Sequence, residues 1–128
     1  SGGFMEGIEI LIPVPLDPAR ERRRGYNQSR CIAEGIASYS SLPVRSDILV
    51  RTGKSGSQTS RGRYERWENV EGLFTVRRPG EIQGRHLMVV DDVITTGSTI
   101  EACVNALHDA GDVKVSVVAL AVAQKLTL

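Results

Sequence analysis

The chain has 128 residues, of which 41% are hydrophobic and 24% are charged. This length fits one domain, and the balance excludes a disordered chain. The net charge of +1 argues against a general attraction to nucleic acid or membranes. We expect a cytoplasmic protein, because neither a signal peptide nor a membrane-spanning run is evident and the two cysteines match no disulfide framework or zinc spacing. Residues 1–7 are interpreted as a tail that begins with a cloning remnant, and residues 8–128 as the domain.

The first elements predicted are a strand over residues 8–12, ended by Pro13-Val14-Pro15, and an arginine-rich loop over residues 16–26. Asn27 is a predicted N-cap of a helix. That helix would bury one face, formed by Ile32, Ile36 and Tyr39.

A second strand is predicted over residues 44–50, followed by a long polar loop over residues 53–66. A loop of that length in a small domain is uncommon and is often functional. The Gly, Ser and Thr content of residues 53–62 predicts a mobile segment that orders when a ligand binds. A short strand over residues 73–76 and a turn at Pro79-Gly80 follow.

Residues 87–90 form a continuous apolar run, as expected of a strand buried on both faces. A helix over residues 98–110 and a final buried strand over residues 113–122 complete the chain. Strands that alternate with helices predict an α/β fold with a mostly parallel sheet flanked by helices. The last helix is expected to have a capping box at Ser98 and Glu101, a C-cap at Gly111, and an apolar face formed by Ile100, Cys103, Val104 and Leu107.

The segment from Val89 to Thr99 carries the clearest functional signal. Asp91 and Asp92 stand where the buried run ends, and ligands bind at the carboxyl ends of parallel strands. The turn that follows opens a helix, so its backbone N–H groups, hydroxyls and helix dipole suit a phosphate. Carboxylates beside it suit sugar hydroxyls, or magnesium held through water. The unit therefore predicts a sugar-phosphate site, whose phosphate-binding residues are Thr95, Thr96, Gly97, Ser98 and Thr99.

Two other phosphate-binding motifs are excluded. A Walker loop requires Gly-Lys followed by Ser or Thr in the turn, and this chain has no such string there. A dinucleotide fold requires its glycines after the first strand, where this chain has prolines.

The same segment resembles the motif for phosphoribosyl pyrophosphate (PRPP) in the type I phosphoribosyltransferases. Two more strings, Pro13-Val14-Pro15-Leu16 and Arg24-Gly25-Tyr26-Asn27-Gln28, are similar to the competence-protein ComF family. The resemblance covers the chain from Ile10 to Ala121 and implies the type I phosphoribosyltransferase fold with a flexible hood loop. It continues at matching spacing through Arg51, Gln58, Arg66, Asn69 and Phe74.

Two departures from the family pattern are visible. Arg61 stands where the family usually has Leu, and no cysteine-rich ribbon precedes Ile8, so we predict no zinc.

The resemblance also implies roles for individual residues. Asp91 and Asp92 would hold the ribose hydroxyls and the magnesium shell, with no direct metal ligand from the protein. Arg51 and Arg66, in the hood, would join the two acids in catalysis. The loop that contains Leu16, Asp17 and Arg24 would bind the pyrophosphate.

The expected function is PRPP- and Mg²⁺-dependent phosphoribosyl transfer to an unidentified acceptor, with release of pyrophosphate. The alternative is a non-catalytic PRPP-binding or adaptor module in DNA uptake. An ammonia-using, amidotransferase-like domain is disfavoured because no N-terminal cysteine nucleophile is present.

The expected partners are PRPP or a related sugar phosphate and proteins of DNA uptake or processing. The sequence gives weak support for single-stranded DNA as a partner, and no membrane is expected. A second copy of the chain, forming a homodimer, is a further candidate partner.

Overall fold

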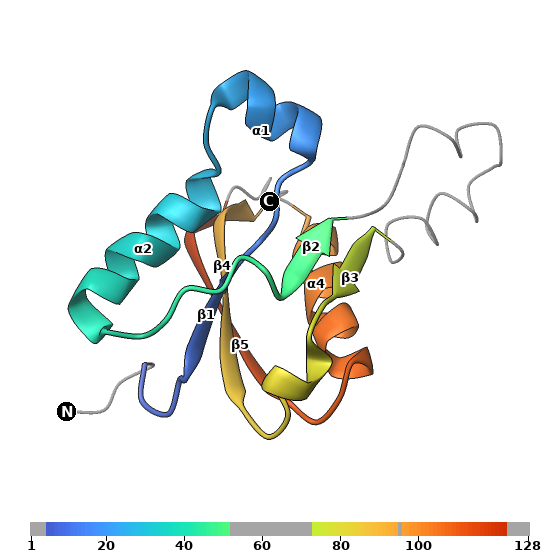
Figure 1. The fold of residues 1–128 in the computed structure, drawn as a ribbon. Coiled ribbons are helices and arrows are strands. Elements are labelled where there is room, and N and C mark those ends of the chain that lie inside the picture. The colour runs from blue at the N-terminus through green and yellow to red at the C-terminus, as the bar shows by residue number, and fades with distance from the viewer. Residues whose placement is uncertain (1–4, 52–72, 95, 123–128) are drawn as a thin grey trace, which may run out of the picture.

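The computed structural model describes residues 5–51, 73–94 and 96–122. Within these residues, β1 (Ile10–Pro13), β4 (His86–Ile94) and β5 (Lys114–Val122) form a sheet in the order β1-β4-β5. Both pairings are parallel, and α4 (Ser98–Asp109) connects β4 to β5. The predicted α/β fold with a parallel sheet flanked by helices is therefore confirmed (Figure 1).

Helices and a small second sheet cover the two faces of this sheet (Figure 1). Helix α2 (Gln28–Ser40) packs on one face. The other face carries α4 and the antiparallel pair β2 (Leu49–Arg51) and β3 (Phe74–Val76). Because alternate residues of a strand point to opposite faces, β4 contributes to both cores. Its buried side chains divide accordingly, with Leu87 and Val89 toward α4, and Met88 and Val90 toward α2.

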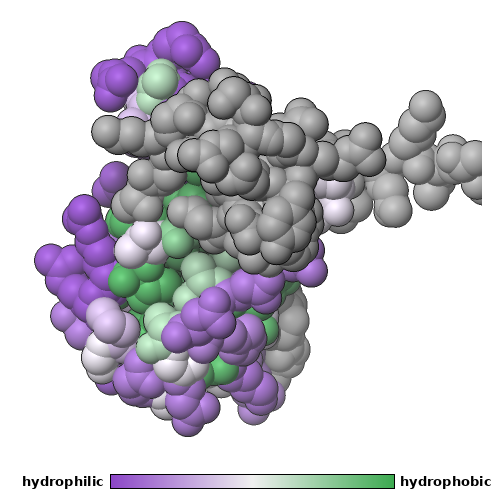
Figure 2. Space-filling model, turned by 90° about the vertical axis from the view of Figure 1, so that its right-hand side faces the viewer, coloured by the Kyte–Doolittle hydropathy of each residue, from purple (hydrophilic) through white to green (hydrophobic). Residues whose placement is uncertain are grey.

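Residues 16–26 differ from the predicted loop, because they include the helix α1 (Pro18–Arg24). The side chain of Asp17 accepts a hydrogen bond from the backbone N of Ala19 at 3.0 Å, and Pro18 occupies the first turn. Gly25 ends the helix with a φ of 83°, which glycine adopts without strain. No residue of α1 is buried, so the helix lacks an apolar stripe. It forms a hydrophilic surface at the top of the molecule (Figure 2).

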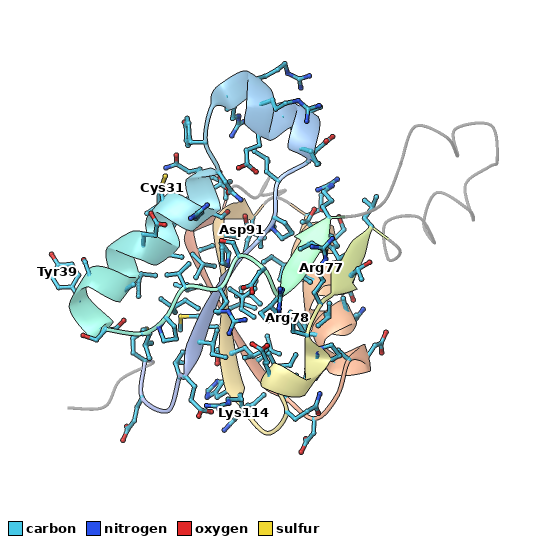
Figure 3. All side chains as sticks on the ribbon, in the orientation of Figure 1. Cys31, Tyr39, Arg77, Arg78, Asp91 and Lys114 are labelled. Carbon is cyan, nitrogen blue, oxygen red and sulfur yellow. The ribbon has the colours of Figure 1, made fainter. Side chains whose placement is uncertain are left out.

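Asn27 caps α2 as predicted, but the buried face of that helix is different. Tyr39 is 94% exposed and points away from the molecule at the far end of α2 (Figure 3). Ala33 is buried instead, between the partly buried Ile32 and Ile36. A small side chain allows the helix to approach the sheet closely, and this contact replaces the expected aromatic one.

Three further predictions need correction. Residues 44–50 do not form one strand: Val44 makes an isolated bridge to Leu11, and β2 begins at Leu49. The strand predicted to be buried, β5, is an edge strand in the described residues, and its Leu120 is 70% exposed. The prediction was wrong because an apolar run does not distinguish an edge strand from a buried strand. Helix α4 begins after Gly97 with no side-chain cap, so Ser98 makes no capping box.

The remaining predicted elements lie close to their expected places. The turn at Pro79-Gly80 is a short 3-10 helix, η2 (Pro79–Glu81), and α4 ends with Ala110 as its C-cap, one residue before Gly111. None of the described helices is long and apolar enough to cross a membrane.

Candidate functional site

A cleft opens at the carboxyl ends of β1 and β4, where an open parallel sheet usually binds ligands. Among the described residues six segments line it: the chain just after β1, helix α1, the start of α2, the end of β2, the end of β4, and the turn from β4 into α4. Asp91 lies at the end of the sheet, beneath α1 and between α2 and β2 (Figure 3). The cleft therefore brings together residues from 14 to 100 along the chain.

Asp91 is the most buried charged residue described in the cleft, with 8% of its surface exposed. Its Oδ1 accepts hydrogen bonds from Ser29 Oγ at 3.3 Å and from the backbone N of Asp92 at 2.8 Å. Burial raises the pKa of Asp91 above its ordinary value, and the neighbouring Asp92 carboxylate adds to this shift. Oδ1 is therefore held by two donors of the protein, and the Asp91 carboxyl also interacts with the side chain of Asp92.

Asp92 also lines the cleft, and its Oδ1 accepts a hydrogen bond from the backbone N of Val93 at 2.7 Å. Strand β4 runs past both acids to Ile94, and Val93 still pairs with Ala121 of β5. The acids are therefore fixed on a hydrogen-bonded strand rather than on a loop. Rigid placement of this kind favours precise recognition of sugar hydroxyls.

The turn after β4, which the sequence predicts to bind phosphate, forms one end of the cleft. Thr96, Gly97 and Thr99 line the cleft, whereas Ser98 does not, and Thr95 lies outside the described residues. The hydroxyls of Thr96 and Ser98 contact each other at 2.9 Å. Gly97 has a φ of 85° and no atom within 4 Å of an added Cβ, so its backbone angle is what requires glycine. The N-terminus of α4 then opens toward the cleft and favours an anion.

Among the described residues three arginines give the cleft positive charge: Arg20, Arg24 and Arg51. Arg20 and Arg24 are four residues apart on α1, so they lie on one face of that helix. Arg20 was missed by sequence analysis, because the spacing has meaning only once residues 18–24 are known to be helical. The capping signals at Asp17-Pro18 and Gly25 could have revealed that helix.

Of the remaining described residues predicted for the site, one lies in the cleft and the other does not. Leu16 lines the cleft, whereas Asp17 does not, and its carboxylate caps α1. The expected hood spans residues 51–66, and apart from Arg51 all of it, including Arg66, lies outside the described residues.

The donor chemistry of the cleft fits magnesium bound together with a phosphorylated ligand. The described residues contain no group of three or more His, Cys, Asp or Glu side chains that could hold a metal ion. They do offer the carboxylate oxygens of Asp91 and Asp92 beside the turn that leads into α4. Mg²⁺ usually takes one or two carboxylates, several waters and oxygens of the ligand phosphates. These two acids would hold it through water.

Comparison with known proteins gives a consistent result. Residues 11–126 match the family described as "Phosphoribosyl transferase domain". The chain is 33% identical over 114 residues to Competence protein F of Haemophilus influenzae, covering 88% of this chain and 50% of that protein. It is 36% identical over 90 residues to the DNA utilization protein YhgH of Escherichia coli O157:H7, covering 70% of this chain and 39% of that protein.

A third relative is Competence protein ComFC of Bacillus subtilis, with 29% identity over 102 residues, covering 80% of this chain and 39% of that protein. The chain thus spans half or less of the length of these relatives.

Proposed function

We propose that this chain, which belongs to the phosphoribosyltransferase domain family and within it to the ComF proteins, binds PRPP and transfers its phosphoribosyl group to an acceptor. One observation carries the proposal. A single cleft holds two adjacent carboxylates, a helix N-terminus after a Thr-Gly turn, and three arginines. The carboxylates match the ribose hydroxyls of PRPP, the helix N-terminus matches its 5-phosphate, and the arginines match its pyrophosphate.

Each part of the ligand has a partner of suitable chemistry. The carboxylates of Asp91 and Asp92 accept hydrogen bonds from the ribose hydroxyls. The backbone N–H groups and hydroxyls at Thr96, Gly97 and Thr99 hold the 5-phosphate. Arg20 and Arg24 offer planar sets of donors to the pyrophosphate. The ligand is thus held at both ends, with its anomeric carbon between them.

The reaction needs no covalent bond to the protein. A lone pair of the acceptor forms a bond to C1 of the ribose, while the bond from C1 to the pyrophosphate oxygen breaks and pyrophosphate leaves with the electron pair. Negative charge therefore grows on pyrophosphate, where the arginines stabilise it. When bound, magnesium would supply further positive charge to the phosphates at this site. The acids orient the sugar beside the positive charge that develops at C1.

The names of the relatives suggest the setting of this activity. They refer to competence and to DNA utilization. We propose that the chain acts with proteins of DNA uptake or DNA processing, and we keep the cytoplasm as its proposed location. Its net charge of +1 gives little support to direct binding of single-stranded DNA.

The test is calorimetric titration of the chain with PRPP and Mg²⁺, followed by measurement of pyrophosphate release with candidate acceptors. The proposal expects saturable binding and acceptor-dependent release. Absence of saturable binding would contradict the site. Binding without release by any nucleophile would favour the alternative of a PRPP-binding module without transferase activity.

A further inference from the structure

Asp91 belongs to a closed path of hydrogen bonds that joins β4, β1 and α2. The backbone N of Val14, just after β1, donates to the carbonyl of Val90 at 2.9 Å. The carbonyl of Val14 in turn accepts from Asn27 Nδ2 at 3.2 Å. Asn27 Oδ1 accepts from the backbone N of Ser29 at 2.9 Å. Ser29 Oγ then reaches back to Asp91, the residue after Val90, and closes the path.

Ser29 is well suited to orient the acid. It is 5% exposed, and its hydroxyl lies 3.3 Å from Asp91 Oδ1, across 62 positions in the sequence. The backbone N of Asp92 donates to the same oxygen at 2.8 Å. Two donors on Oδ1 fix the carboxylate plane, because rotation about the side chain would break both hydrogen bonds. The carboxylate, which lines the cleft, is thereby held in one orientation.

Asn27 makes Ser29 an effective support. As the N-cap of α2 it accepts from the backbone N of both Ser29 and Arg30, while its amide donates to Val14. The start of α2 is therefore tied to the end of β1, which pairs with β4 in register. The helix and the sheet therefore fix the position of the Ser29 hydroxyl. The side chain of the neighbouring Arg30 is exposed and pairs with Glu34.

We propose that Ser29 is a positioning residue, which holds the Asp91 carboxylate in the orientation that accepts the sugar hydroxyls. This inference rests on the proposed function for its ligand. Its structural part stands on the hydrogen bonds alone. Ser29 would act through Asp91 and leave phosphate binding at the turn after β4 unaffected.

The first experiment measures the affinity of the full chain for ribose 5-phosphate and for inorganic phosphate, without magnesium. Ser29→Ala is expected to weaken ribose 5-phosphate binding by about three- to tenfold, the effect of one hydrogen bond. Phosphate affinity should be unchanged, and Ser29→Thr, which keeps the hydroxyl, should restore sugar binding. Ser38→Ala is the matched control, since Ser38 is exposed on the same helix and bonds only to Gly35 in the described residues.

A double-mutant cycle with Asp91→Asn separates positioning from general damage. If Ser29 acts through Asp91, Ser29→Ala should change sugar affinity by less than about twofold in the Asp91→Asn background. Equal losses in both backgrounds, or an equal loss of phosphate affinity, would overturn the proposal.

A second measurement needs no ligand. Amide hydrogen exchange at Asp92, whose N–H shares Oδ1 with Ser29, should accelerate in Ser29→Ala and stay unchanged in Ser29→Thr and Ser38→Ala. Unchanged exchange in Ser29→Ala would overturn the positioning role. A parent chain that binds no ribose 5-phosphate would contradict the proposed function, and the exchange rates would still decide the role of Ser29.

Discussion

The guanidinium of Arg51 lies over the ring of Phe74, 5.4 Å from its centroid, at a paired position of the β2–β3 ladder. Arg51 lines the cleft and Phe74 is buried, so the ring holds the cation at the mouth of the site. A cation over an aromatic face is stabilised even at a partly exposed position.

Phe74→Leu tests this contact, because leucine keeps an apolar side chain but removes the aromatic face. We expect PRPP affinity to fall by about two- to fivefold, since a cation–π contact of this kind contributes roughly 0.5–1 kcal/mol. Calorimetry measures the affinity, and Val76→Ala controls for destabilisation of the same strand without a change at Arg51. Equal affinity of Phe74→Leu and the parent would show that the ring does not support Arg51.

The arginines of α1 separate into two groups with the same charge. Arg20 and Arg24 line the cleft, whereas Arg22 and Arg23 do not. We expect Arg20→Ala/Arg24→Ala to weaken PRPP binding by about tenfold or more, since hydrogen bonds to charged groups contribute roughly 1.5–3 kcal/mol each. Arg22→Ala/Arg23→Ala removes the same charge from the same helix and should change the affinity by less than about twofold. Similar losses in both variants would mean that only the general charge of α1 matters.

Asp91 should lower the stability of the fold at neutral pH. Burial raises its pKa in the folded state, so the protonated form favours folding at low pH, and that contribution is lost as the pH rises through the folded pKa. Asp91→Asn is neutral at every pH and should be more stable than the parent at pH 7. Denaturant unfolding from pH 7 down to pH 4 should show this advantage shrinking. A variant less stable than the parent at pH 7 would contradict this account of Asp91.

The two cysteines should differ strongly in reactivity. Cys31 is exposed, whereas Cys103 is fully buried on α4, and burial raises the pKa of Cys103 to about 12. Because the thiolate is the reactive form, Cys103 should resist a disulfide reagent at pH 8. Native protein should therefore release one equivalent of chromophore, and Cys31→Ser none, until denaturant is added. Rapid labelling of Cys103 in native Cys31→Ser would show that α4 opens readily.

Sequence patterns predicted the elements whose side chains form the hydrophobic core. Leu87–Val90 is apolar at every position because β4 is central and covered on both faces, and a short, unbroken apolar run is typical of such a strand. The acids near the end of β4 and the turn after this strand were predicted from the same pattern, since the end of such a strand fixes where a ligand binds.

The missed features depend on contacts that periodicity does not record. Helix α1 buries nothing, so its end signals at Asp17 and Gly25 were the available clues. An apolar strand such as β5 looks the same at an edge as in the middle of a sheet. The hydrogen bond from Ser29 to Asp91 joins residues 62 positions apart, which local patterns do not reveal.

The most direct test of the central claim is the affinity of Asp91→Asn/Asp92→Asn for PRPP with Mg²⁺, measured by calorimetry beside the parent. The amides preserve side-chain size but remove both negative charges next to the sugar site. Each charge-assisted hydrogen bond contributes roughly 1.5–3 kcal/mol, so we predict at least a tenfold loss of affinity in a variant that still folds. A folded double variant that binds PRPP as tightly as the parent would contradict the assignment of this cleft as the PRPP site.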